Sequence, residues 1–308
     1  MSHPIKIGVV GVGHMGREHA RIYSELSGAE LVGVYDTDPA AAKKVADKYR
    51  TRIFSSLDEM VDAVEAASIV TPTVTHLAVA EPFLRKGKHI LVEKPIAMDT
   101  AEARQMVTLA DQHGAKLAVG HVERFNPVLA ALEERLGRPR FIEAHRLSPY
   151  PGRSTDIGVV MDLMIHDLEI ILHLVRSPVS SVDAVGVPVL SKGEDIANAR
   201  IRFANGCVAN LTTSRISPEK LRKIRVFQDD AYLSLDYLKQ EGQMYRRQDG
   251  KITRDNIPVR KGEPLRNQLD EFLNNVRHGT DPRVGGSHGF AALKLASQIC
   301  EQITSVGV

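Results

Sequence analysis

Segments of β-branched composition and segments of helical composition alternate regularly through the first 120 residues of the chain. This alternation is typical of βαβ units, in which parallel strands form a sheet and helices cover both of its faces. We therefore predict an N-terminal doubly wound α/β domain with a parallel sheet. Its expected strands are Lys6–Val10, Leu31–Tyr35, Arg52–Phe54, Ala67–Val70, His89–Val92 and Lys116–Val119, and its expected helices are His14–Leu26, Pro39–Tyr49, Leu57–Val64, Val74–Lys86 and Thr100–His113.

After residue 120 the pattern changes to long β-like segments joined by short turns. Ala204-Asn205-Gly206 and Asp229-Asp230 are typical of turns that connect antiparallel strands. We expect a second, α+β domain with a mostly antiparallel open sheet, so that the domains span residues 1–121 and 122–308, with the C-terminal helix able to pack back on the first domain. The expected strands are Phe141–Leu147, Val182–Val189, Ala199–Thr213, Lys223–Gln228 and Tyr232–Tyr237, and the expected helices are Pro127–Leu136, Met161–Leu174, Leu265–Arg277 and Gly289–Thr304.

The composition excludes several classes of protein. The 308 residues include 40 basic and 38 acidic side chains, and this net charge of +2 provides no strong field for nucleic acid. The N-terminus lacks the features of a signal peptide, and charged side chains interrupt the most apolar window, residues 157–175. Cys207 and Cys300 form no disulfide framework and fit a reducing compartment. We expect a cytoplasmic protein with no nucleic-acid or membrane partner.

The sequence Gly11-Val12-Gly13-His14-Met15-Gly16 follows the first expected strand and precedes the first expected helix, the context in which GxGxxG binds a dinucleotide. Gly11 permits the tight turn, Gly13 allows the backbone to approach a pyrophosphate, and Gly16 allows close packing of helix and strand. His14 and Met15 complete this loop at the helix N-terminus, where unpaired N–H groups can bind phosphate oxygens. The alternative is a tight βα turn without a ligand.

Asp36 lies at the end of the second expected strand, 20 residues beyond Gly16. A carboxylate at this position can accept both ribose hydroxyls of NAD and would repel the 2′-phosphate of NADP. No arginine follows it in Thr37-Asp38-Pro39, where an NADP site commonly has one. The sequence therefore favours NAD, although Asp36 or Asp38 would also serve as an ordinary helix N-cap.

Two further groups of residues have the chemistry of an active site. Lys94, in Val92-Glu93-Lys94-Pro95, follows an expected parallel strand and can donate to a substrate oxygen or transfer a proton; a surface lysine beside a turn is the alternative. Asp162 and His166 are four positions apart and would share one helical face, so that the carboxylate can orient the imidazole for proton removal. A helix-stabilising pair, a core histidine, and a metal site that includes His173 are the alternatives; the last lacks a recognised ligand spacing.

These residues together carry a resemblance to a known family. GVVGVGHMGREH, TPTVTH at residues 71–76, GKHILVEKP at residues 87–95, and the Asp162/His166 pair resemble the glucose–fructose oxidoreductase / inositol 2-dehydrogenase (Gfo/Idh/MocA) family. The resemblance implies an NAD(P)-dependent oxidoreductase acting on sugars, cyclitols or their nucleotide-linked or acid forms. It also implies an N-terminal Rossmann domain and a C-terminal domain whose open sheet forms homodimers or homotetramers.

The resemblance also implies roles for individual residues. Lys94, Asp162 and His166 match the catalytic trio of the family, and Pro95 matches a proline that a cis peptide commonly precedes. The matching cofactor-binding residues beyond the glycine loop and Asp36 are Thr71, Pro72, His76, Glu93 and Lys94, with the first three near the nicotinamide ribose.

The substrate side is predicted from two segments. His121, Arg124 and Asn126 follow the last strand of the first domain and are expected to face the substrate, with Arg153 available for an anion in the loop 148–158. The segments HVERFNP and AHRLSPYPGR resemble a branch of the family that oxidises UDP-N-acetylglucosamine at C3. Arginine binds phosphate oxygens well, but Arg124, Arg146 and Arg153 could instead pair with Glu123, Glu143 or Asp156, and the loop could be a solvated connector.

The sequence thus predicts an NAD-dependent dehydrogenase that oxidises a secondary hydroxyl of a sugar or nucleotide sugar to a ketone, without a metal. We expect His166 to take the hydroxyl proton, Asp162 to orient His166, and Lys94 to polarise the oxygen or relay the proton. Two alternatives remain: a non-catalytic dinucleotide-binding regulatory protein, and a reductase of a non-sugar substrate on the same fold.

Overall fold

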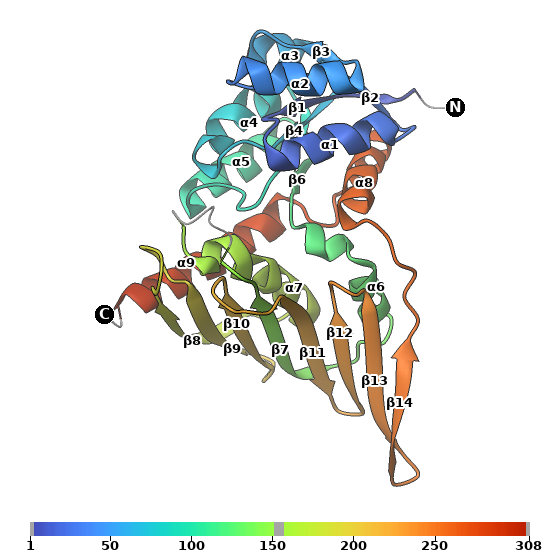
Figure 1. Ribbon diagram of the computed structural model, residues 1–308, viewed down its shortest axis with the longest axis vertical. Coiled ribbons are helices and arrows are strands. Elements are labelled where there is room, and N and C mark those ends of the chain that lie inside the picture. Colours follow the sequence, from blue (N-terminus) through green and yellow to red (C-terminus); the bar gives the residue numbers. More distant parts are fainter. Residues whose placement is uncertain (1–2, 151–156, 306–308) are drawn as a thin grey trace. The chain divides into compact units, whose positions relative to one another are not determined.

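The computed structural model describes residues 3–150 and 157–305 (Figure 1). The chain divides into two compact units: Met1–Val122 with Leu265–Ala291, and Glu123–Pro264 with Ala292–Val308. Residues 265–291 belong to the first unit, although they follow the expected domain boundary in the sequence. The division into domains at residues 121 and 122 stays a prediction. Among the described residues, no helix combines the length and the apolar character needed to cross a membrane.

The first unit contains a six-stranded parallel sheet with the order β3-β2-β1-β4-β5-β6. The chain runs outward from β1 to β3, returns, and continues from β4 to β6 on the other side, so the strand order reverses between β1 and β4. In a doubly wound sheet this reversal is where ligands bind, outside the carboxyl ends of the strands. The prediction of this fold is confirmed, with strands β1 Ile5–Val10, β2 Ala29–Tyr35, β3 Arg52–Ile53, β4 Ala66–Ile69, β5 His89–Val92 and β6 Leu117–Val119.

Helices cover this sheet because each presents an apolar stripe to it. Ile22 on α1 and Phe272 on α8 belong to the same buried cluster as Ile7 and Val9 on β1. The expected helix from Val74 begins instead with a 3₁₀ turn, Thr73–Thr75, before α4. The helices of the unit are α1 His14–Glu25, α2 Pro39–Tyr49, α3 Leu57–Ala63, α4 His76–Arg85, α5 Thr100–Gln112 and α8 Pro264–His278.

The second unit contains an eight-stranded sheet with the order β14-β13-β12-β11-β7-β10-β9-β8. Neighbouring strands are antiparallel except β7 and β10, which confirms the expected mostly antiparallel sheet. The expected single segment Ala199–Thr213 is two strands, and two further strands, β13 and β14, were not predicted. The strands are β7 Pro139–Leu147, β8 Val179–Val187, β9 Ile196–Phe203, β10 Val208–Ser214, β11 Leu221–Gln228, β12 Ala231–Asp236, β13 Glu241–Gln248 and β14 Lys251–Ile257.

Helices lie over one face of this second sheet (Figure 1). Ile170 and Ile171 on α7 share a buried cluster with Leu211 on β10 and Val226 on β11, and Leu295 on α9 belongs to the same cluster. A π-helical turn, Val160–Met164, runs directly into α7. The helices are α6 Pro127–Glu133, α7 Ile165–Val175 and α9 Gly286–Ser305, the last of which begins in the first unit.

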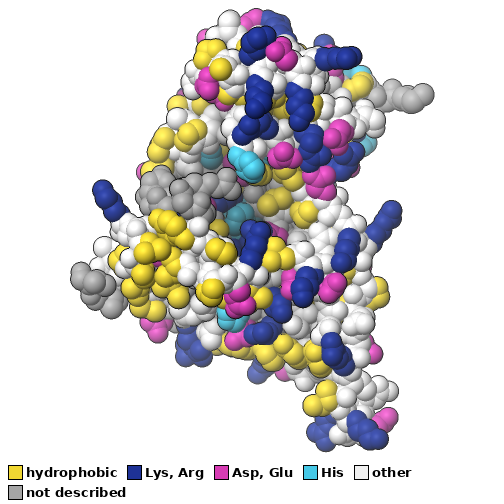
Figure 2. Space-filling view, viewed as in Figure 1, with side chains coloured by type: hydrophobic (Ala, Val, Ile, Leu, Met, Phe, Trp, Pro, Cys, Tyr) yellow, Lys and Arg dark blue, Asp and Glu magenta, His cyan; other side chains and the backbone are white. Residues whose placement is uncertain are grey.

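The opposite face of the second sheet carries a row of aromatic side chains. Phe141, Phe227, Tyr232 and Tyr245 come from four adjacent strands, with ring centroids 5.6, 4.6 and 5.2 Å apart in turn. Arg254 on β14 extends the row, with its guanidinium 5.9 Å from the Tyr245 ring centroid. All four rings are partly exposed to solvent. Elsewhere, acidic and basic side chains are interspersed over the visible surface, without a continuous basic patch (Figure 2).

Candidate active site

The glycine loop between β1 and α1 is shaped by two close approaches of backbone. Gly11 has φ +83°, and a Cβ atom there would lie 2.6 Å from the Val70 carbonyl oxygen. A Cβ atom on Gly16 would overlap the carbonyl oxygen of Gly11. A Cβ atom on Gly13, in contrast, would meet no atom within 4 Å, so the start of α1 is open to a ligand. The loop therefore has the geometry of a phosphate-binding turn.

Two aspartates at the end of β2 have separate functions. Asp38 is the N-cap of α2 and accepts a hydrogen bond from the Ala40 N–H at 2.9 Å. Asp36 accepts from the Val12 N–H at 2.7 Å and from the Asp38 N–H at 2.9 Å, so its carboxylate is fixed beside the glycine loop. Because Asp38 already caps the helix, the alternative interpretation of Asp36 as the N-cap does not apply.

A cavity of about 720 Å³ lies along the carboxyl ends of the strands in the first unit. The strand order places its groups in sequence along the edge: Asp36 after β2, Gly13 after β1, Thr71 after β4 and Lys94 after β5. This order matches an extended dinucleotide with one ribose at Asp36 and its pyrophosphate at the glycine loop. The predicted cofactor residues that line the cavity are Gly11, Gly13, Met15, Asp36, Thr71, Pro72, Glu93 and Lys94.

The remaining predicted cofactor residues do not line this cavity. Gly16 packs against the loop, as described, and His14 lines a different surface pocket between α1 and α2. His76 is buried, with Nε2 3.0 Å from the Thr71 carbonyl oxygen and Nδ1 3.0 Å from that of Pro95. Burial lowers the pKa of His76. His76 thus connects the segment after β4 to the segment after β5, where the Lys94–Pro95 peptide is cis.

Sequence reasoning missed His19, a fully buried residue of α1. Its Nε2 lies 3.2 Å from a carboxylate oxygen of Glu93 in the cavity lining. The signal in the sequence was the position of this histidine three residues after the last glycine of the loop. That position places it on the face of α1 that packs against the sheet.

Asp162 and His166 both lie in the second unit, at the beginning of its central helix. Asp162 belongs to the π-helical turn and His166 to the first turn of α7, and both are partly exposed. The expected regular α-helix through both residues is therefore wrong, because the π turn is wider. Such turns are found frequently at functional sites.

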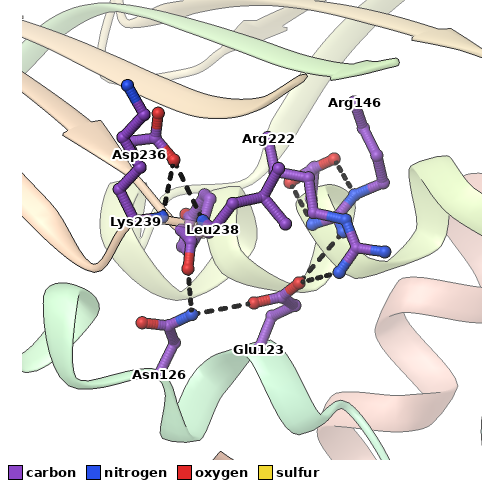
Figure 3. Close-up of polar contacts among 9 residues, drawn as sticks. Glu123, Asn126, Arg146, Arg222, Asp236, Leu238 and Lys239 are labelled. Atoms are coloured by element: carbon purple, nitrogen blue, oxygen red, sulfur yellow. Dashed lines mark hydrogen bonds and ion pairs between the residues drawn. The ribbon is translucent and has the colours of Figure 1, made fainter. Parts of the chain in front are cut away.

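The predicted substrate residues occupy different environments. His121 is buried after β6, and Arg124 is buried in an ion pair with Glu169, at 3.1 Å. Asn126 is the N-cap of α6, and its amide donates to Glu123 and to the Tyr237 carbonyl oxygen (Figure 3). Both Arg124 and Asn126 thus have structural partners, and contact with substrate stays a prediction for them. Arg153 lies outside the described residues.

A buried ion network surrounds Arg146 in the second unit (Figure 3). Its guanidinium donates to both carboxylate oxygens of Asp167, at 2.8 and 2.9 Å, and to Glu123 at 3.1 Å. Arg222 donates to the same Glu123 oxygen at 3.0 Å. Burial alone would raise the pKa of Glu123, but the charges of Arg146 and Arg222 lower it. Arg146 thus pairs with Glu123, as the alternative interpretation of these arginines allowed, but the pair is internal and not on the surface.

Glu169 is a further buried acid of the second unit and lies in α7. Burial raises its pKa to about 7, although the charge of Arg124 acts in the opposite direction. His173, one helical turn further, lies 2.9 Å from Glu133. Within residues 3–150 and 157–305, no cluster of three histidine, cysteine or acidic residues has the geometry to hold a metal ion.

The parallel sheet, the glycine loop and the fixed Asp36 define a dinucleotide-binding protein. A family model described as "Oxidoreductase family, NAD-binding Rossmann fold" matches residues 5–121, and one described as "GFO/IDH/MocA C-terminal domain" matches residues 130–234. The chain belongs to the Gfo/Idh/MocA family of oxidoreductases. It is an NAD-dependent dehydrogenase of that family, and the resemblance inferred from its motifs is confirmed.

Individual relatives resemble the chain over nearly its whole length. UDP-N-acetylglucosamine 3-dehydrogenase of Acidithiobacillus ferrooxidans is 39% identical over 302 residues, 96% of each chain. A solved structure of that enzyme has a TM-score of 0.95 and covers 99% of both chains at 38% identity. Inositol 2-dehydrogenase of Rhizobium meliloti is 28% identical over 320 residues, 95% of this chain and 94% of the relative.

Proposed function

We propose that the enzyme oxidises the C3 hydroxyl of UDP-N-acetylglucosamine, or of a closely similar nucleotide sugar, to a ketone. The observation that carries this proposal is the 39% identity, over 96% of both chains, to an enzyme named for that reaction. The 28% identity to an inositol 2-dehydrogenase is lower, which favours a nucleotide sugar over a cyclitol.

Bound NAD supplies the acceptor for the hydride that leaves the sugar carbon. The glycine loop would bind the pyrophosphate through N–H groups of α1, and the two oxygens of Asp36 would accept the hydroxyls of one ribose. Thr71, Pro72, Glu93 and Lys94 line the opposite end of the cavity, where the nicotinamide would lie. His14 and Met15 would form part of the phosphate-binding loop. His76 would position the segments at the nicotinamide end of the cavity, because it contacts the carbonyl oxygens of Thr71 and Pro95.

The chain's own residues would move the hydroxyl proton. His166 would accept it, Asp162 would hold the imidazole in the required orientation, and Lys94 would polarise the substrate oxygen. The proposed role of Lys94 is supported by its position in the cavity lining, directly after β5. Asp162 and His166 are supported by their place in the π turn and the first turn of α7.

The substrate's own phosphates need partners beyond the catalytic residues. We propose His121, Arg124, Asn126 and Arg153 as the substrate-binding residues. Arg153 is the arginine of this group to test first, because Arg124 already pairs with buried Glu169. Replacement of Arg153 by alanine should raise KM for the nucleotide sugar with little change in kcat.

We propose that the open face of the second sheet joins two copies of the chain in a homodimer, or in a homotetramer built from such dimers. The support is the row of stacked, partly exposed aromatic rings from Phe141 to Tyr245, which would be buried by a second sheet. Tyr232→Lys should reduce the mass measured by light scattering, while Val74→Lys, at an exposed apolar residue of the first unit, should leave it unchanged.

We also propose that the enzyme is cytoplasmic and has no nucleic-acid or membrane partner. Cys207 and Cys300 are free thiols in the structure, as a reducing compartment requires.

The reaction can be tested by following NADH absorbance with NAD and a panel of substrates. UDP-N-acetylglucosamine should be oxidised, and free UDP should inhibit competitively because it would bind the same phosphate-binding residues. Rapid oxidation of myo-inositol or free glucose, without inhibition by UDP, would contradict the proposed substrate.

A further inference from the structure

His19 and Glu93 form a largely buried pair at the wall of the cofactor cavity. His19 comes from the second turn of α1, and Glu93 directly follows β5. Nε2 of His19 lies 3.2 Å from Oε1 of Glu93, and the two side chains are 0% and 14% exposed. Glu93 also lines the cavity next to Lys94. One partner of the pair is therefore enclosed, while the other lines the cavity.

The position of the Glu93 carboxylate is fixed from several sides. Its Oε2 accepts a hydrogen bond from the Lys94 N–H at 3.3 Å, in addition to the contact with His19. A Cβ atom on Gly120 would lie 2.8 Å from the carboxylate, which would have to shift to make room for it. These contacts leave the carboxylate little freedom to move out of the cavity wall.

The hydrogen bond determines which nitrogen of His19 carries a proton. An ionised carboxylate only accepts hydrogen bonds, so Nε2 of His19 must donate. Within the described part of the chain, Nδ1 of His19 is buried and has no hydrogen-bond partner. His19 therefore acts as a hydrogen-bond donor to the Glu93 carboxylate.

We propose that His19 is a positioning residue that holds the charge of Glu93 in the cofactor cavity, and that this charge favours the oxidised cofactor over the reduced one. The physical reason is that the nicotinamide ring of NAD⁺ is cationic, whereas that of NADH is neutral. A fixed carboxylate attracts the cation only, most strongly where water is excluded. This inference rests on the proposed placement of the nicotinamide at the Glu93 end of the cavity.

Lys94 carries the opposite charge in the same cavity and acts in the opposite direction. The charge of Lys94 does not change the direction of the Glu93 effect on cofactor preference. A neutral side chain at position 93 removes attraction for NAD⁺ whatever Lys94 contributes. Tyr23, one turn after His19 on α1, provides a matched control. It is equally buried, and its hydroxyl pairs with Ser68 at 2.8 Å rather than with the carboxylate.

The experiment measures Kd for NAD⁺ and for NADH by titration of the full-length protein and its variants. Glu93→Gln should raise Kd for NAD⁺ by about tenfold relative to Kd for NADH. His19→Leu should raise the same ratio by about threefold, because the carboxylate is then no longer held in place. His19→Gln offers an amide donor to the carboxylate and should restore the wild-type ratio. Tyr23→Phe should leave the ratio unchanged.

The outcomes separate this inference from the proposed function. If the wild type binds both cofactor forms but Glu93→Gln weakens them equally, the charge effect is wrong and the dehydrogenase assignment still stands. If His19→Leu lowers both affinities without changing their ratio, His19 has only a structural role. If the wild type binds neither form, the proposed cofactor site itself is wrong. Should His19→Leu fail to fold, Glu93→Gln still tests the charge effect, and a changed ratio in His19→Gln would contradict the positioning role.

Discussion

The charged residues of the two units are used in different ways. In the first unit, Asp36 and Lys94 lie at the ends of parallel strands and face a cavity. In the second unit, Glu123, Arg146 and Asp167 face one another in the interior, and each is less than a tenth exposed. Asp36 and Lys94, at the edge of the parallel sheet, are therefore available to a ligand, whereas the charges of this internal network are balanced by one another.

Removal of a charge that faces the cavity should affect catalysis. Lys94→Ala should lower kcat by about 10²–10⁴-fold, because it removes the group that would polarise the substrate oxygen. Its Kd for NAD⁺ should change by no more than about threefold, since the glycine loop and Asp36 are untouched. Steady-state kinetics and a binding titration measure the two effects. Full activity would refute the catalytic role of Lys94.

Removal of an interior charge should instead affect stability. Arg146→Met leaves Asp167 and Glu123 buried without their main partner and should lower the free energy of unfolding by about 3–5 kcal/mol. Arg225→Met is the control, because the Arg225–Glu143 pair, at 2.7 Å, is about one-third exposed on each side. It should lose at most about 1 kcal/mol in the same urea denaturation. Equal losses in both variants would mean that the internal network has no special importance.

The free energy of unfolding should depend on pH through Glu169 in the second unit. The pKa of Glu169 is about 7 in the folded protein, above its value in the unfolded chain, because of burial. The folded state therefore binds this proton more tightly, and the contribution to stability is present at low pH and lost as pH rises toward 7. Between pH 5 and pH 8 the loss should be on the order of 2 kcal/mol.

Glu169→Gln isolates this contribution, because glutamine does not titrate. The difference in unfolding free energy between wild type and Glu169→Gln should shift in favour of the variant as pH rises from 5 to 8. Urea denaturation at pH 5, 6, 7 and 8 measures the difference. A constant difference across this range would exclude a raised pKa for Glu169.

Asp36 and Asp38, the two aspartates after β2, should differ in the property that each controls. Asp36→Ala should narrow the preference for NAD over NADP by about tenfold, because it removes both the acceptor for ribose and the repulsion of a 2′-phosphate. Asp38→Ala removes the N-cap of α2 and should lower stability by about 1 kcal/mol without changing that preference. Affinities for both cofactors, measured in the two variants, test this assignment. An unchanged ratio in Asp36→Ala would contradict it.

The first unit could be predicted well because its information is local. Each strand end, glycine and acid of the cavity lies in a short segment with its own pattern, and the order of a doubly wound sheet then brings these segments together. His19 was missed because its partner, Glu93, is 74 positions away and the residue resembles an ordinary core histidine.

The second unit was less predictable because its pairs depend on tertiary contacts. β13 and β14 consist mainly of polar residues, so no apolar alternation marked them as strands. Arg222 and Glu123 are 99 positions apart, and nothing local distinguishes an arginine that binds phosphate from one in an internal pair. The π turn at Asp162 likewise lacks a sequence signal that separates it from a regular helix.

Hydride transfer from C3 of a nucleotide sugar to NAD can be followed with a labelled substrate. UDP-N-acetylglucosamine carrying deuterium at C3 is incubated with the enzyme and NAD, and the reduced cofactor is analysed by mass spectrometry. We expect reduced cofactor that carries the deuterium, together with a 3-keto product. Reduced cofactor without deuterium, or none at all, would contradict it.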